Sequence, residues 1–104
     1  MDNTRQQLAH WQAQVAADAN NATAWFNFGW WSNRAGFFAQ AVQAYEESIA
    51  RGISDPEEAM SNLASVYSER LANTSMAAQW LDRALEIRPD YYQAVFNRAH
   101  IAEQ

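Results

Sequence analysis

Residues 22–45 read ATAWFNFGWWSNRAGFFAQAVQAY, and this stretch contains the pattern that the rest of the chain repeats. Apolar and small residues recur every three or four positions on both sides of Gly36, which is the spacing of one buried face on an α-helix. Gly36 stands where a residue in the left-handed conformation would end the first helix. The stretch therefore predicts a helix, a tight turn and a second helix.

Helices of this kind account for the whole chain. Only three glycines and two prolines occur in 104 residues, while alanine recurs at nearly every third or fourth position. Alanine is the strongest helix former, whereas short strands need frequent turn residues. The sequence predicts an all-α protein of about six helices, at residues 4–17, 22–35, 38–51, 56–70, 75–88 and 91–104.

The ends of these helices carry recognisable signals. Asp55 precedes a proline as an N-cap acid, and Glu58 is placed to complete a capping box. Gly36 and Gly52 are expected to end the second and third helices in the left-handed conformation. Asn73 is expected to do the same for the fourth helix.

The helices repeat at a fixed spacing. The second, fourth and sixth helices align at 35 residues, which matches small and polar residues in triples such as Ala24, Ala59 and Ala94, or Asn27, Asn62 and Asn97. The third and fifth helices align at 36 residues instead. We expect the extra residue in the turn Leu71–Ser75. The first helix precedes the fifth by 70 residues, twice the period, and matches the second half of a repeat.

A chain of 104 residues is long enough for one domain and too short for two. Within it we expect an N-terminal half-repeat at 1–19, complete repeats at 20–54 and 55–89, and the first helix of a third repeat at 90–104. A helix–turn–helix unit of this period cannot bury its apolar face alone and must stack on its neighbours. The sequence therefore predicts an α-solenoid of antiparallel helix pairs.

The residues that carry the repeat resemble the tetratricopeptide repeat (TPR) family, in its bacterial type. The matching motifs are Trp25-x-x-Phe28-Gly29-x-x-Ser32 and Ala41-x-x-x-Tyr45, followed in the next repeat by Leu63-Ala64-x-x-Tyr67, Ala77-x-x-x-Leu81 and Ala84–Pro89. The resemblance covers essentially the whole chain. It implies a right-handed superhelix in which the first helix of each repeat lines a concave groove, and it implies binding of a protein or peptide there.

Helix periodicity separates a buried face from a groove face in the first helix of each repeat. The largest core residues are expected to be Trp25, Phe28, Tyr45, Leu63, Tyr67, Leu81 and Leu85. The candidate partner-binding residues on the groove face are Phe26, Asn27, Trp30, Arg34, Glu58, Asn62, Ser65, Glu69, Phe96, Asn97 and His100. This face is aromatic at both ends and small in the middle, which suits an extended segment with apolar side chains.

Two features of the groove face allow two interpretations each. Asparagine is a poor helix former, so three at one phase need a reason. They either capture a peptide backbone or hydrogen-bond to the neighbouring repeat. Trp30 and Trp31 are adjacent and cannot face the same way. We expect Trp31 to pack against the preceding helices and Trp30 to face the groove.

Composition excludes several classes of partner. Twelve acidic residues stand against seven arginines and no lysine, which gives a net charge of −5 and a pI of about 4.8. No basic patch could neutralise phosphates, so we expect no binding to nucleic acid or to an anionic membrane. No window approaches the roughly 18 apolar residues of a membrane span. We expect a cytoplasmic protein, or a periplasmic one if the chain is a fragment of a longer protein.

No residue pattern points to catalysis. The chain has no cysteine, which excludes disulfides and thiolate metal sites. His10 and His100 lie in the first and last helices, and neither has a partner at metal-ligand spacing. Adjacent glutamates point about 100° apart on a helix and cannot act as an acid–base pair. We therefore expect no enzyme activity, no metal and no cofactor.

The leading functional interpretation is an adaptor that binds a mostly uncharged or basic extended segment with one or two apolar anchors. One alternative is a structural, self-associating module. Another is the TPR part of a longer enzyme, transport or assembly system, such as a cytochrome c maturation factor. Some TPR domains bind acidic chaperone tails through cations, but Glu58 and Glu69 stand where such a site would need them.

The last predicted helix ends the chain without a second helix to pair with. Its inward stripe of Val95, Ala99 and Ala102 is then covered on one side only, with Arg98 and Glu103 as polar residues nearby. Terminal helices of solenoids are usually polar on their free face. We expect a piece of a longer repeat protein, whose edge in isolation either frays or pairs with the same edge of a second copy in a weak two-fold dimer.

Overall fold

Helices form where the periodicity predicts them. The computed structural model describes residues 2–102, and in this range the chain forms α-helices, one π-helical segment and no strand. The elements are α1 (Thr4–Ala17), α2 (Ala22–Ala35), α3 (Phe38–Ala50), α4 (Pro56–Ser65), η1 (Val66–Arg70), α5 (Thr74–Ile87) and α6 (Tyr92–Ala102). The all-α class and the six helices are confirmed. Of the predicted sixth helix, Glu103 and Gln104 lie outside the described residues.

Membrane insertion can be checked against these elements directly. No helix within residues 2–102 combines the length and the apolar character that crossing a bilayer requires.

A capping side chain and two glycines mark the ends of α2 and α3. The amide oxygen of Asn21 accepts a hydrogen bond from the backbone N–H of Ala24 at 3.1 Å, which caps α2. Gly36 and Gly52 end α2 and α3 with φ angles of 90° and 80°. Glycine adopts this left-handed region without steric cost, so the predicted ends of these helices are confirmed.

Two of the predicted helix ends are wrong in detail. Asn73 does not adopt the left-handed conformation; it caps α5 instead, accepting from the backbone N–H of Met76 at 3.1 Å. Ala72 is the left-handed residue, with φ 53°. Asp55 is the N-cap residue of α4, but its own φ is 54° and its side chain makes no capping hydrogen bond. The side-chain hydrogen bond that the predicted capping box requires of Asp55 is therefore absent.

The extra residue of the second repeat lies inside a helix, not in the turn Leu71–Ser75. Gly36 and Ala72 are both left-handed turn residues and stand 36 residues apart, so the insertion precedes Ala72. It coincides with η1, where the N–H of Leu71 donates to the carbonyl of Val66, five residues earlier, at 3.1 Å. A π-helical turn accommodates one additional residue within a helix. The second repeat therefore keeps the left-handed turn at Ala72 and accommodates the extra residue in the wider π-helical segment before it.

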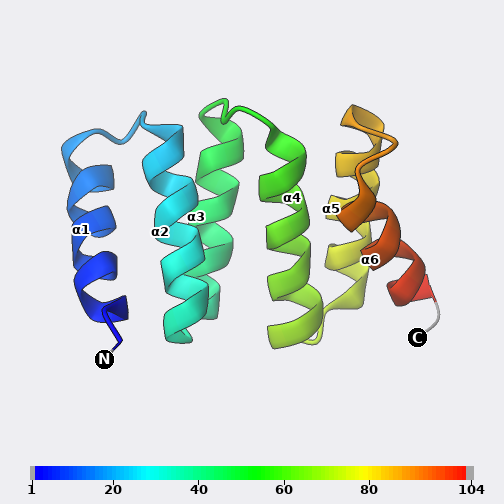
Figure 1. Ribbon diagram of the computed structural model, residues 1–104, viewed down its shortest axis with the longest axis horizontal. Helices are drawn as coiled ribbons and strands as arrows, with labels where there is room; N and C mark the ends of the chain where they lie inside the picture. The colour runs from blue at the N-terminus through cyan, green and yellow to red at the C-terminus, as the bar shows by residue number, and fades with distance from the viewer. Residues whose placement is uncertain (1, 103–104) are drawn as a thin grey trace. The chain divides into compact units, whose positions relative to one another are not determined.

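The chain consists of two units, residues 1–54 and residues 55–104. In unit 1, α1, α2 and α3 run antiparallel in succession, and α2 packs against both others (Figure 1). Its core contains Val15, Ala24, Phe28 and Ala44, with Leu8, Trp11 and Trp25 packed against them. Whether the two units act as one domain of repeats stays a prediction.

A close contact holds α2 and α3 together. A Cβ added at Gly29 would lie 3.1 Å from the ring of Tyr45, which is itself 1 % exposed. Only glycine lets the ring approach the helix backbone this closely. The contact between α2 and α3 therefore requires the smallest residue at this position.

Unit 2 is built from α4, η1, α5 and α6. The helices α4 and α5 form an antiparallel pair, and α6 packs mainly on α5 while also touching α4 (Figure 1). Arg98 on α6 donates to a carboxylate oxygen of Asp82 on α5 at 2.8 Å. The fully buried residues of this unit include Ala59, Leu63, Ala77, Leu81, Ala84 and Ala94.

Of the seven predicted core residues, four are buried and three are only half-buried. Phe28, Tyr45, Leu63 and Leu81 are buried. The remaining three are half-buried: Trp25, Tyr67 and Leu85. The indole N–H of Trp25 donates to the carbonyl of Ala19 at 2.9 Å, which keeps one edge of the ring at the surface.

We predict that Leu63→Ala lowers the free energy of unfolding by about 2–5 kcal/mol, because it removes buried methyl groups and leaves a cavity. Leu71→Ala is the matched control, since Leu71 is 41 % exposed while Leu63 is fully buried. Urea denaturation of both variants measures the difference. Equal losses would contradict the assignment of Leu63 to the core.

Candidate functional site

A cavity of about 280 Å³ opens in unit 2 between the α4–η1 segment and α6, with α5 beneath it. Its lining residues are Ala64, Ser65, Ser68, Glu69, Leu81, Phe96, Asn97, His100 and Ile101. Three helices and the π-helical segment therefore contribute to one hollow. Helix periodicity brings the α6 residues together, since Phe96 and Asn97 stand one helical turn before His100 and Ile101.

The cavity is apolar below and polar at its rim. Leu81 is fully buried and Ile101 half-buried, so they form an apolar floor with Ala64. Phe96 is 59 % exposed and presents its ring to solvent and cavity alike. The rim carries hydroxyl, amide, imidazole and carboxylate groups from Ser65, Ser68, Asn97, His100 and Glu69. An apolar pocket with a few polar groups is the usual composition of a binding site.

Five of the predicted groove residues meet in this cavity: Ser65, Glu69, Phe96, Asn97 and His100. Two others of unit 2 do not line it. Glu58 is exposed in the first turn of α4, and Asn62 is half-buried one turn before Ser65. Their role in binding stays a prediction.

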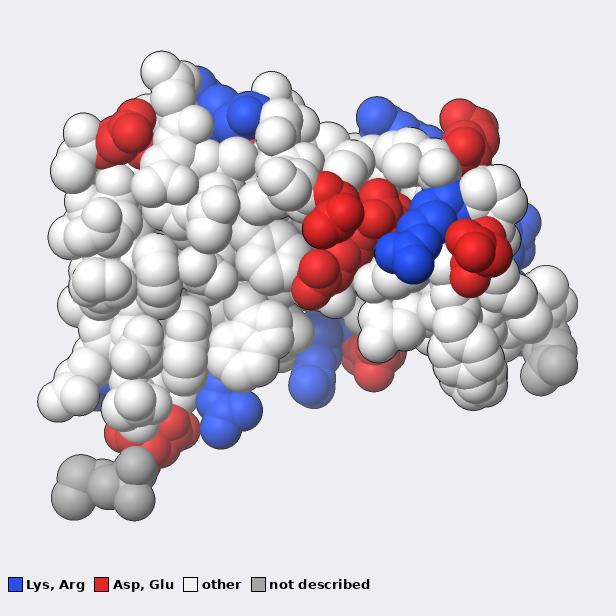
Figure 2. All heavy atoms as spheres, turned by 45° about the horizontal axis from the view of Figure 1, so that its top comes forward, with Lys and Arg blue, Asp and Glu red and all other residues white. Residues whose placement is uncertain are grey.

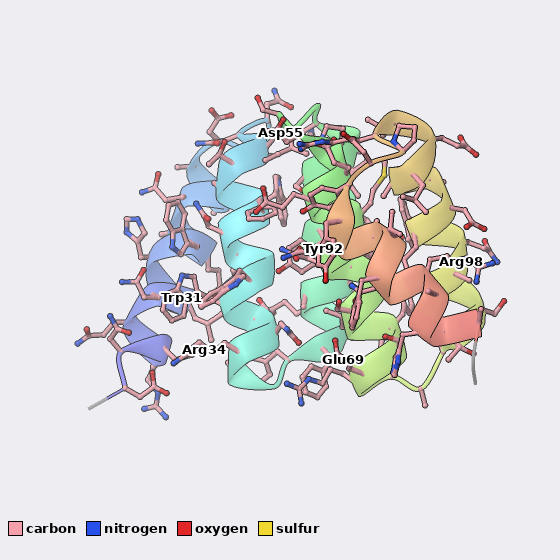
Figure 3. The ribbon with its side chains drawn as sticks, turned by 45° about the vertical axis from the view of Figure 1, so that its right-hand side comes forward. Trp31, Arg34, Asp55, Glu69, Tyr92 and Arg98 are labelled. Carbon is pink, nitrogen blue, oxygen red and sulfur yellow. The ribbon has the colours of Figure 1, made fainter. Side chains whose placement is uncertain are left out.

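The other four predicted residues lie on α2 in unit 1. Phe26 is half-buried and meets Tyr45 edge to face, with 5.6 Å between ring centroids. Asn27 is half-buried, whereas Trp30 is 43 % exposed. The guanidinium of Arg34 lies over the rings of Trp30 and Trp31, at 5.6 Å and 5.9 Å from their centroids. Figure 3 shows Trp31 and Arg34 on the side of α2 that is turned to α1.

The asparagines at equivalent positions of the three repeat helices, Asn27, Asn62 and Asn97, differ in their surroundings. Only Asn97 lines the cavity. Within its own unit, none of Asn27, Asn62 and Asn97 forms a side-chain hydrogen bond among the residues that the structure describes. Capture of a peptide backbone by these amides stays a prediction.

Four lining residues were not among the predicted site residues. Leu81 was expected in the core, and Ala64 was matched only as part of the motif Leu63-Ala64-x-x-Tyr67. Both also line the cavity. Ile101 shares the phase of Trp31, which periodicity assigns to packing. Ser68 could not be found from periodicity, because it lies in the π-helical segment, where the α-helical spacing does not hold.

Unit 1 has its own cavity, of about 300 Å³, which is lined by residues of α1, α2 and α3. It is lined by Gln12, Val15, Ala16, Trp25, Phe28, Gln40, Gln43 and Ala44, none of them charged. On the face shown in Figure 2, the charged side chains of unit 1 are confined to its two ends. No candidate residue from the sequence lines this hollow.

The two units differ in charge. Residues 55–104 contain eight acidic residues and four arginines, whereas residues 1–54 contain four acidic residues and three arginines. Near the start of α4, the Glu57 carboxylate is nearly buried, and its oxygen lies 3.9 Å from the guanidinium of Arg88. Arg88 also lies 3.6 Å from the Asp90 carboxylate.

These acidic residues affect the pKa of the Tyr91 phenol. Burial raises the pKa of Tyr91 above its ordinary value, and the negative charges of Glu58 and Glu57 raise it further. The positive charge of Arg88 acts in the opposite direction and does not cancel the effect.

Metal-ligating side chains do not cluster in the described range, residues 2–102. No group of three or more histidine, aspartate and glutamate side chains lies close enough there to hold an ion. Within the cavity, His100 and Glu69 are the titratable residues that line it.

Comparison with known proteins gives a structural match only. No protein-family model matches the chain, and no curated protein matches it. Among solved structures, the chain is similar to the N-terminal domain of stress-induced protein-1 (STI-1) from C. elegans, with a TM-score of 0.79 and 22% sequence identity. The match covers 90% of this chain and 77% of that chain. The fold is therefore a TPR-like helical fold, while the bacterial type stays an expectation.

We predict that stability falls as pH rises above about 10, and that Tyr91→Phe removes part of this fall. The unfolded chain ionises Tyr91 near its ordinary pKa, while the folded chain holds the proton to a higher pH. The stabilisation is complete below the unfolded pKa and is lost as pH rises through the folded pKa. Urea denaturation between pH 8 and 11 measures the slope. Identical slopes for both proteins would show that Tyr91 titrates alike in the folded and unfolded states.

Proposed function

We propose that this chain is a non-catalytic protein-interaction module that binds an extended segment of a partner in the cavity of unit 2. The observation that carries the proposal is the juxtaposition of an apolar floor, an exposed phenyl ring and a polar rim on neighbouring helices. The TPR-like fold supports it, because the sequence resemblance to that family implies protein or peptide binding.

The size of the cavity suits one side chain with its flanking backbone. Sites for whole small molecules occupy about 300–1,000 Å³ and enclose most of the ligand. This cavity is at the lower limit, about 280 Å³, and opens between helices. An apolar side chain would pack on Leu81 and Phe96, while Asn97 and Ser65 would hydrogen-bond the adjacent peptide groups.

The exposed residues of α2 are proposed as additional partner contacts. Trp30 offers an aromatic surface that is 43 % exposed, and Arg34 lies over it as a cation. Phe26 and Asn27 are half-buried and would contribute less contact area. Aromatic residues and arginine are the types that most often dominate the energy of an interface.

We predict that Phe96→Ala weakens binding of a partner segment by about 1–3 kcal/mol, with little loss of thermal stability. Tyr92→Ala is the matched control: Tyr92 stacks on Phe96 with 6.1 Å between centroids, yet it does not line the cavity. Peptides selected from a random nine-residue display library would serve as ligands, and titration calorimetry would measure affinity. Selected peptides that bind Phe96→Ala unchanged would exclude this cavity as the site.

A second role, self-association through α6, is favoured by one observation. Tyr92 is 75 % exposed and Val95 is 45 % exposed, and both are uncharged. Figure 3 shows Tyr92 leaving α6 away from α5, while Arg98 leaves it toward α5. In an antiparallel two-fold pair, Tyr92 of one copy would lie over the small Ala99 of the other. We propose that this face pairs weakly with a second copy.

We predict that Val95→Asp weakens this self-association roughly tenfold or more, because an unpaired carboxylate would be buried in the contact. Gln93→Asp is the control, since it adds the same charge to an exposed position on another side of α6. Light scattering over a dilution series measures both. A strictly monomeric unsubstituted chain at millimolar concentration would rule the dimer out.

A further inference from the structure

The π-helical segment stands at the wall of the cavity in unit 2. Of its five residues, Ser68 and Glu69 line the cavity, together with Ser65 immediately before it. A π-helix has more residues per turn than an α-helix, so successive side chains diverge by a smaller angle. Two consecutive residues can therefore share one face here. π-helical turns within helices are frequent at functional sites.

The corresponding helix of unit 1 lacks this widening. Its helix α2 stays α-helical to Ala35, with Asn33 and Arg34 at the positions 35 residues before Ser68 and Glu69. Asn33 is half-buried and Arg34 exposed, so the two side chains lie in different environments. The inserted residue thus changes which side chains unit 2 presents beside its cavity, and it leaves the helix-to-helix packing in place.

Glu69 provides an uncompensated negative charge at the cavity. Its side chain is exposed and forms no ion pair within the described residues. The Ser68 hydroxyl donates to the carbonyl of Ser65 at 3.5 Å, so its lone pairs remain available as acceptors. The apolar floor of Leu81 and Ile101 lies beside these groups. Figure 3 shows Glu69 near the end of the α4–η1 segment.

We infer that the partner segment carries a lysine or arginine next to its apolar anchor, and that Ser68 and Glu69 hold this cation. The inference rests on the proposed function and names the chemistry of its ligand. The apolar side chain would enter the cavity, and the neighbouring ammonium or guanidinium would meet the Glu69 carboxylate at its edge. Charge complementarity extends beyond this contact, because residues 55–104 contain eight acidic residues against four arginines.

The same charges disfavour the opposite ligand. An acidic segment would place like charges together beside Glu69 in a unit that is already negative. An uncharged segment would gain the apolar contact alone. Between the uncharged and the basic segments that the sequence allows, the unpaired carboxylate favours the basic one.

The test uses the composition of peptides selected by the full chain from a random nine-residue display library. We expect lysine or arginine to be enriched beside an apolar residue. Replacing that cation by glutamine in a selected peptide should weaken binding about two- to fivefold, the size expected for a partly exposed ion pair. The loss should shrink at high salt.

The variants of the chain give the decisive comparison. Glu69→Arg should reverse the preference, so that selection enriches aspartate or glutamate beside the anchor. Glu86→Arg is the matched control, because it changes the net charge equally at an exposed position of α5 that does not line the cavity. Glu69→Gln, with folding verified by circular dichroism, should remove the preference for a cation without reversing it.

The outcomes separate the inference from the proposed function. Peptides that depend on Phe96 but show no basic enrichment, and the same selection by Glu69→Arg, would overturn the cation contact and leave the peptide site standing. A reversal by Glu86→Arg as strong as that by Glu69→Arg would assign the effect to net charge and also overturn it. If the chain selects no peptide at all, the proposed function fails, and the inference fails with it.

Discussion

Close approach between helices at small residues is the constraint on which both units depend. Ala24 and Ala41 in unit 1, and Ala59 and Ala77 in unit 2, have no exposed surface. At Gly29 even a methyl group would press on the Tyr45 ring at 3.1 Å. Such crossings fix the phase of every helix, because a rotation would bring a larger side chain into the contact. The rotation of each helix about its axis also determines which of its side chains face the solvent.

The insertion in the second repeat illustrates how strong that constraint is. An extra residue could shift the phase of α4 or lengthen the following turn. Instead Ala59 and Leu63 stay fully buried before the insertion, Ala77 stays fully buried after it, and the residue is absorbed as η1. The π-helical turn is limited to residues 66–70, which border the cavity together with Ala64 and Ser65 of α4. The packing of the buried residues on both sides of the insertion is therefore preserved.

The spacing of residues in the sequence predicts the features that both repeats share, but it does not predict local departures from the repeat. The helix positions, the left-handed Gly36 and the burial of Leu63 and Leu81 follow from spacing, because each reflects an average property of a helix face. Five cavity residues were predictable for the same reason. Ser68 was not, since its position depends on a local change in hydrogen bonding that no residue type announces. Asn73 was misassigned because asparagine serves both as a left-handed residue and as an N-cap, and tertiary context selects the second.

The left-handed Ala72 gives unit 2 a built-in weak point. A non-glycine residue in this conformation costs about 1–2 kcal/mol, a cost that Gly36 spares the equivalent turn of unit 1. Local opening therefore requires less free energy at residues 71–73 than at the matching turn, and amide hydrogen exchange would begin there. This turn directly follows the segment that holds Ser68 and Glu69. A ligand bound to those residues would suppress the opening, so occupancy of the cavity would be reported by slowed exchange in a loop that the ligand does not touch.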